Sequence, residues 1–196
     1  VFSIQRNQLM LSLIYLTRWN LFATVVASSL SAYFSTQHYC GKFKKRMSVG
    51  LKIYWFTYNS VPVYAIYISL IYWLVLYDGK EINLNNFLTH GTNCIGPLID
   101  IMIVNHPHCI AQSIFPMICA VFYSIFTYVY QQLGGVNFNG DNFVYPILDW
   151  DQRPLLALTV AVTAVFCGGL FHMFFCAVIQ LRIKIHQIMN SDKNLI

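Results

Sequence analysis

Charged residues are scarce in this sequence. Asp, Glu, Lys and Arg make up 10% of the 196 residues, whereas soluble globular domains carry about a quarter. At the same time, 57% of the residues are hydrophobic and 16% are aromatic. Since a water-exposed surface needs many more charged side chains than this, the scarcity of charge excludes an ordinary soluble domain and indicates an integral membrane protein.

The sequence also lacks any basic motif interleaved with aromatics, although its formal net charge is +5. The basic residues gather beside apolar segments, where the anionic surface of a membrane attracts them. We therefore expect membrane lipids as partners and no nucleic acid.

Cysteine is absent from the two segments predicted to face outward, 78–86 and 131–153, and the chain has no Asn-x-Ser/Thr site. These residues therefore offer no extracellular disulfide framework. A recognised metal-ligand spacing is lacking as well. We interpret His106-Pro107-His108, with Cys109 and His38 on the same side, as a polar turn, and His172 as a helix-packing residue. No metal or cofactor is expected.

Long apolar runs are what the sequence has in abundance. A helix of about 20 residues crosses the hydrocarbon core of a bilayer. Five runs approach or exceed this length, at about 9–34, 51–77, 87–105, 109–130 and 154–181. We predict an all-α polytopic membrane bundle that forms a single domain over residues 1–196. Because the chain opens at Val1 rather than Met, we expect at least one further span upstream.

The basic residues predict the orientation of these spans. The densest basic run, KFKKR at 42–46, lies in loop 35–50, and eight of the 12 Lys and Arg residues fall on the side of this loop when the spans alternate. By the positive-inside rule, loop 35–50 and the C-terminus are cytoplasmic.

Polar side chains interrupt the run at 87–105. His90, Asn93, Pro97 and Asp100 recur every three or four residues, which places them on one face of a helix. An unpaired ionisable group within a bilayer costs roughly 2.5 to 3.5 kcal/mol on insertion scales. This face is therefore predicted to point inward, toward other helices or a wet cavity.

Thr17, His90 and Asn93 lie at comparable predicted depths, roughly 5 to 12 Å in from the outer ends of their spans. They are candidates for a shared pocket in which His90 takes the proton of a threonine nucleophile. Three further charged residues are candidates for orienting the base or stabilising an oxyanion: Arg18, Asp149 and Asp151. Asp100 lies deeper and is an alternative to Asp149 for orienting His90.

The same residues have a plainer interpretation. Thr17 bonds its own helix backbone, His90 and Asn93 hold helices together, and Arg18 pairs with Asp100 inside the membrane. A third alternative is a transporter or channel, which requires a polar path that continues inward from Asp100.

The longest predicted outer loop, 131–153, ends in the run from Tyr145 to Trp150. Its turn residues and amphipathic aromatics suit the headgroup level of a membrane. The run forms either a lid over the outer mouth of the pocket or an interfacial belt, so Tyr145, Asp149 and Trp150 are candidate binding residues.

The motifs YLTRWN at 15–20, HGTN at 90–93 and YPILDW at 145–150 resemble those of the rolling stone family of insects. The resemblance covers nearly the whole chain. It implies a multi-spanning protein of the plasma membrane with a role in myoblast or cell fusion and muscle development, and with a protein partner in that process.

A more distant resemblance is to the androgen-induced gene family of transmembrane threonine hydrolases, which cleave esters between fatty acids and hydroxy fatty acids. Thr17 matches that family's nucleophile, and His90 matches the first histidine of its H-G-x-H run. The family's catalytic histidine aligns with Asn93. The resemblance implies hydrolysis of lipid esters as the alternative function, with His90 as base and Asn93 as a donor to the oxyanion.

Overall fold

The computed structural model describes residues 11–43, 47–77, 79, 84, 87–104, 106 and 108–193, with side chains described as far as residue 190. Over these residues the chain forms helices joined by turns and irregular connections, with no β-strand. The predicted all-α class is therefore confirmed. The predictions for residues 1–10, for the basic residues at 44–46 and for most of loop 78–86 lie outside the described part.

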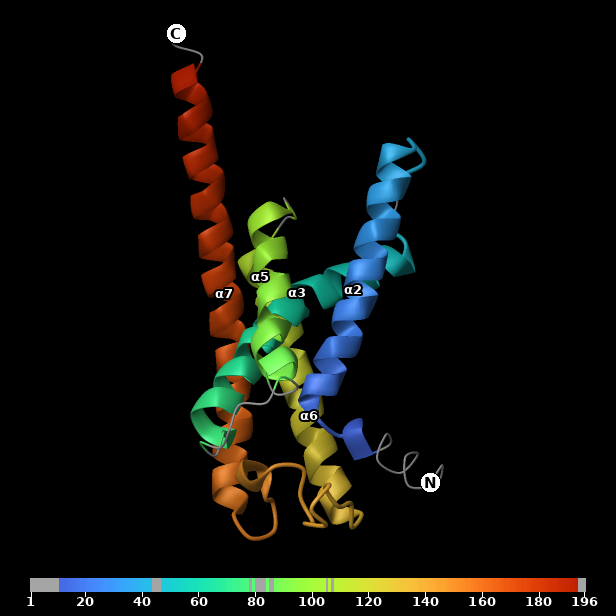
Figure 1. The fold of residues 1–196 in the computed structure, drawn as a ribbon, viewed down its shortest axis with the longest axis vertical. Helices are drawn as coiled ribbons and strands as arrows, with labels where there is room; N and C mark the ends of the chain where they lie inside the picture. Colours follow the sequence, from blue (N-terminus) through green and yellow to red (C-terminus); the bar gives the residue numbers. More distant parts are fainter. Residues whose placement is uncertain are drawn as a thin grey trace.

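The long helices run alternately up and down the molecule (Figure 1). They are α2 (Leu16–Tyr39), α3 (Val49–Ile71), α5 (Thr92–Ile103), α6 (Ile114–Gln132) and α7 (Pro154–Lys193). Short helices extend or precede them: η1 (Tyr72–Leu76), η2 (Phe87–Gly91), η3 (Ile110–Ser113) and η4 (Pro146–Leu148). The C-terminal ends of α2, α5 and α7 point to one end of the molecule, and loop 133–153 lies at the other (Figure 1).

Among the described residues, three stretches are long and apolar enough to cross a membrane: Val49–Leu76, Ile110–Gln132 and Pro154–Asn190. The segments predicted at 9–34 and 87–105 are helical as well. Arg18 and Asn20 make α2 less apolar, while η2 and α5 contain only 5 and 12 residues. The crossing of five helices therefore stays a prediction.

The first and last helices differ from their predicted bounds. Helix α2 begins at Leu16, since turns occupy the residues just before it. It continues to Tyr39. Helix α7 continues well past residue 181. Its second half has no Pro or Gly after Gly169 to break it, and its C-terminal end extends beyond the other helices (Figure 1).

Helix α3 is the centre of the fold. It packs against α2, α5, α6 and α7, and every residue from 57 to 65 is buried. Its N-terminus is capped by Ser48, whose hydroxyl accepts a hydrogen bond from the N–H of Leu51 at 3.2 Å. Buried apolar residues join α3 to its neighbours in two clusters: Val63, Ile101, Phe175 and Ile179 in one, and Tyr64, Ile68 and Ala120 in the other.

Candidate functional site

A cavity of about 500 Å³ lies among α2, α3, α6, α7 and loop 133–153. This volume is in the range of small-molecule sites. Aromatic rings form much of the wall: Tyr15, Tyr64, Tyr67, Tyr72, Tyr123, Phe138 and Tyr145. Polar or charged side chains are fewer: Ser12, Thr17, Arg18, Thr89, His90 and Ser124. The cavity is therefore an aromatic and aliphatic chamber with a few polar groups.

The first turn of α2 supplies two of these polar groups. Thr17 is buried, whereas Arg18 is exposed. Arg18 also lies close enough to His90 to act on it electrostatically. The Arg18 guanidinium lines the cavity and is also exposed at the protein surface. A guanidinium in such a position is suited to bind a carboxylate or phosphate.

Two π-helices place His90 against this chamber. Tyr72 of η1 and His90 of η2 stack with their ring centroids 3.6 Å apart and their planes 7° apart. The Nδ1 atom of His90 is buried without a hydrogen-bond partner in the described part of the chain. A π-helix closes with bonds that reach one residue further than in an α-helix, so the α-helical spacing that predicted one stripe for His90, Asn93 and Asp100 does not apply to residues 87–91.

Asn93 and Asp100 are not among the residues that line the cavity. Asn93 is buried, and its amide nitrogen has no hydrogen-bond partner among the described residues. Asp100 interacts electrostatically with Tyr54 and Tyr58 of α3. Of the predicted polar stripe, only His90 therefore contributes to the wall.

Tyr123 anchors the start of α2 at the cavity. Its hydroxyl donates to the carbonyl of Ile14 at 2.9 Å and accepts from the N–H of Leu16 at 3.1 Å. The first N–H groups of a helix have no partner within the helix, so a tyrosine hydroxyl here replaces a side-chain cap. The bond holds Thr17 and Arg18 at a fixed place in the wall.

Loop 133–153 covers the same end of the cavity. Phe138 stacks on Tyr15 with centroids 5.5 Å apart, and Tyr145 meets Tyr15 edge-on at 5.6 Å. Burial raises the pKa of Tyr145 to about 12, with the Tyr123 hydroxyl acting in the opposite direction, so Tyr145 stays a neutral phenol at physiological pH. Nothing in the local sequence marks Phe138 as a site residue.

Asp149 and Trp150 brace this loop and do not line the chamber. The Asp149 carboxylate accepts from Nε2 of Gln131 at 2.9 Å, and the N–H of Trp150 donates to Oε1 of Gln131 at 2.9 Å. The indole of Trp150 donates to Thr127 at 3.2 Å. These bonds tie the loop to the end of α6.

The cavity brings Thr17 and His90 into one chamber, but no hydrogen bond joins them among the described residues. A threonine needs a base within hydrogen-bond reach before it can act as a nucleophile. The geometry therefore places a guanidinium and an imidazole beside an apolar wall, with no base in the described part of the chain hydrogen-bonded to Thr17.

The described residues thus define an all-helical protein in which three helices are long and apolar enough to cross a membrane, with an aromatic cavity among the helices. The chain belongs to the rolling stone family: the family described as protein rolling stone matches residues 2–193. Protein rolling stone of Drosophila melanogaster is 31% identical over 181 residues, which are 83% of this chain and 62% of that protein. The chain thus spans less than two thirds of that relative's length. No solved structure matches it.

Proposed function

We propose that this chain binds a single-chain anionic lipid in the aromatic cavity. The observation that carries the proposal is the pairing of a largely apolar wall with Arg18 and with the unpaired Nδ1 of His90. The acyl chain lies along the tyrosines, and the carboxylate or phosphate meets Arg18. His90 donates or accepts according to its tautomer.

The proposed setting is the plasma membrane, with Lys42 and the C-terminal end of α7 on the cytoplasmic side. The positive-inside rule supports this orientation, because Lys42 follows α2 and Lys184 lies in the second half of α7, and the C-terminal ends of both helices point away from loop 133–153 (Figure 1). In that setting, the resemblance to the rolling stone family supports a role in cell fusion and muscle development. Lipid capture near a membrane surface is the physical step that we assign to the chain.

Binding of oleate to the purified chain in detergent micelles tests the lipid proposal. We expect saturable binding that weakens at least about tenfold in Arg18→Gln, since a charge-assisted hydrogen bond contributes roughly 1.5 to 3 kcal/mol. Ala161→Phe, which fills the chamber from α7, should abolish it. Lys184→Gln is the matched control, because it removes an exposed cation far from the cavity. Equal oleate affinity in all four proteins would show that oleate does not bind in the chamber.

The role in fusion is tested in cultured myoblasts that express the chain. Wild type should raise the number of nuclei per myotube, and Ala161→Phe at equal surface expression should not. If cells that express Ala161→Phe form myotubes with as many nuclei as wild type, fusion does not depend on the cavity.

Hydrolysis of lipid esters is the second candidate, favoured by the shared chamber of Thr17 and His90. In this reaction the Thr17 oxygen attacks the acyl carbon, and His90 takes the threonine proton and passes it to the departing alkoxide. Water then cleaves the acyl-threonine ester, which restores Thr17 and releases the fatty acid. Asn93, outside the lining, has no position here as oxyanion donor.

A fluorophosphonate probe distinguishes the two candidates. A hydrolase predicts labelling that is lost in Thr17→Ala but kept in Thr24→Ala, where the hydroxyl bonds the carbonyl of Asn20 at 2.8 Å. Absence of labelling together with intact oleate binding would leave the chamber as a binding site.

A further inference from the structure

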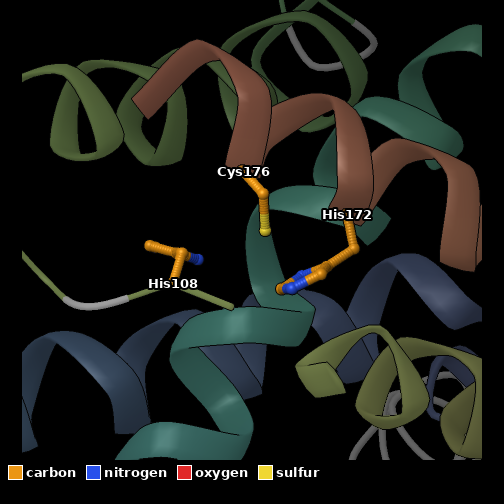
Figure 2. Close-up of side chains that lie close together, drawn as sticks. All are labelled: His108, His172 and Cys176. Carbon is orange, nitrogen blue, oxygen red and sulfur yellow. The ribbon is translucent and has the colours of Figure 1, made fainter. Parts of the chain in front are cut away.

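A second polar cluster lies outside the aromatic cavity, between α7 and the connection that follows α5. One ligand atom from each of His108, His172 and Cys176 lies within 4.8 Å of the others. Figure 2 shows the Cys176 sulfur pointing into the space between the two histidine rings. His172 and Cys176 are one helical turn apart on α7, so they share a face.

Two members of the cluster are buried, and the third has ring nitrogens that are unpaired among the described residues. His172 is 1% exposed and Cys176 is 2% exposed. Both ring nitrogens of His108 are buried without a hydrogen-bond partner in the described part of the chain. Buried polar atoms are nearly always paired, so an imidazole with two unpaired nitrogens in this position points to a ligand that it binds.

His172 is held in the orientation of a metal ligand. Its Nε2 lies 3.1 Å from the carbonyl oxygen of Cys109 and donates its hydrogen there. The lone pair of the ring is therefore on Nδ1. A metal-bound histidine characteristically donates its other N–H to a backbone carbonyl or carboxylate, which fixes the tautomer and the ring.

The donor set selects the kind of ion. Two imidazoles and a thiolate suit zinc, while calcium and magnesium need several oxygen ligands. With zinc bonds of about 2.0 Å to nitrogen and 2.3 Å to sulfur, adjacent ligands of a tetrahedron are roughly 3.3 to 3.7 Å apart. The present separations of up to 4.8 Å need closure by about 1 Å, which His108 provides because it lies in a connection rather than a helix.

We propose that His108, His172 and Cys176 bind one zinc ion, with water in the fourth position. The ion joins the connection after α5 to the middle of α7. Arg182 already links the same two parts of the chain, because its guanidinium donates to the carbonyls of Ile101 and Val104 at 2.7 and 3.1 Å. Zinc therefore fixes the packing of α5 on α7 at a site separate from the lipid chamber.

Cobalt binding to the purified chain tests this site. Tetrahedral Co²⁺ bound by a thiolate gives intense visible bands and a sulfur-to-cobalt charge-transfer band in the near ultraviolet. We expect one Co²⁺ per chain, displaced by Zn²⁺. Cys176→Ser should lose the charge-transfer band, and His108→Asn, which keeps the thiol, should weaken binding by at least about tenfold.

The double variant His38→Asn, Cys40→Ser is the matched control, because it removes one exposed histidine and one exposed cysteine elsewhere. It should bind Co²⁺ like wild type. Because His108→Asn leaves Cys176 in place, it tests the site even if Cys176→Ser fails to fold. The helical circular dichroism and elution volume of His108→Asn should equal those of wild type. Absence of Co²⁺ binding by folded wild type would overturn the proposal. A charge-transfer band that survives Cys176→Ser would do so too.

Discussion

At the scale of single residues, buried hydrogen bonds hold the chamber in shape. The hydroxyl of Tyr64 donates to the carbonyl of Pro116 at 2.6 Å, in the interior between α3 and α6. Tyr64 also packs with Ile68 and Ala120. A buried carbonyl that loses its donor costs more free energy than the bond itself contributes.

Tyr64→Phe is therefore expected to lower the free energy of unfolding by about 1 to 3 kcal/mol. Tyr33→Phe, at an exposed position of α2, should change it by less than about 0.5 kcal/mol. Reversible unfolding in mixed micelles measures both. Equal stability of the two variants would show that the Tyr64 hydroxyl contributes nothing to the fold.

Asp149 gives the fold a dependence on pH. Burial by itself raises the pKa of a carboxyl group, but hydrogen bonds from the N–H of Gln152, from the Gln131 amide and from the N–H of Asp151 lower the pKa of Asp149 below its ordinary value of 3.8. A group with a lower pKa in the folded state stabilises the fold fully above its unfolded pKa. That contribution is lost as the pH falls through the folded value.

We expect the stability difference between wild type and Asp149→Asn to be constant from pH 7 to about pH 5 and to shrink below about pH 4. Asp141→Asn, at an exposed position of the same loop, is the comparison variant, because its carboxylate accepts one hydrogen bond, from Asn137 at 3.1 Å, whereas that of Asp149 accepts three. Unfolding in micelles across this range measures the difference. A gap that does not change at low pH would contradict the assigned role of Asp149.

At the scale of elements, Arg182 of α7 caps the C-terminal end of α5. Its two guanidinium nitrogens bind the carbonyls of Ile101 and Val104, and C-terminal carbonyls of a helix have no partner within it. Lysine keeps the charge but lacks the planar fork that reaches both oxygens.

Arg182→Lys should therefore lower the free energy of unfolding by about 1 to 3 kcal/mol. It should also speed amide hydrogen exchange near residues 101–104. Lys184→Arg, two residues further along α7 and exposed, should leave both unchanged. Unaltered exchange at the end of α5 in Arg182→Lys would mean that the cap is not needed.

The helices were largely predictable from the sequence, and the site was only partly so. Apolar runs predict the stretches Val49–Leu76 and Ile110–Gln132 within a few residues. Counting depth from the helix ends suggested that Thr17 and His90 share a pocket, and both line one cavity. The π-helical turn at His90 has no local signal, so the stripe with Asn93 and Asp100 was expected to stay together.

The parts of the site that could not be predicted depend on contacts between residues that are distant in sequence. Phe138 reaches Tyr15 only through the fold of its loop. Asp149 was a candidate for orienting the base, whereas in the structure its carboxylate accepts a hydrogen bond from Gln131. Cys109 and His38 were weighed as neighbours of His108, whereas the structure brings His172 and Cys176 beside it. Such pairings depend on how helices pack, which periodicity does not encode.

At the scale of the whole molecule, the helices run alternately up and down (Figure 1). This arrangement predicts that one end of the molecule faces the cytoplasm and the other end faces outward. Cysteines introduced as Gln37→Cys and His186→Cys should react with a membrane-impermeant maleimide only after cells are permeabilised, and Asn139→Cys should react in intact cells. A background without accessible cysteines requires Cys40→Ser and Cys109→Ser, since both cysteines are exposed. Labelling of all three positions from one side would contradict the topology.

The account as a whole depends on whether lipid enters the chamber. The most direct measurement is photo-crosslinking with a diazirine analogue of oleate, followed by mass spectrometry of the modified residues. We predict labelled positions on the cavity wall, at Tyr67, Tyr72 and Tyr123, and loss of that labelling in Ala161→Phe. Labelling confined to outward-facing residues such as Phe122 and Leu74, unchanged in that variant, would contradict the account and leave the cavity without a lipid.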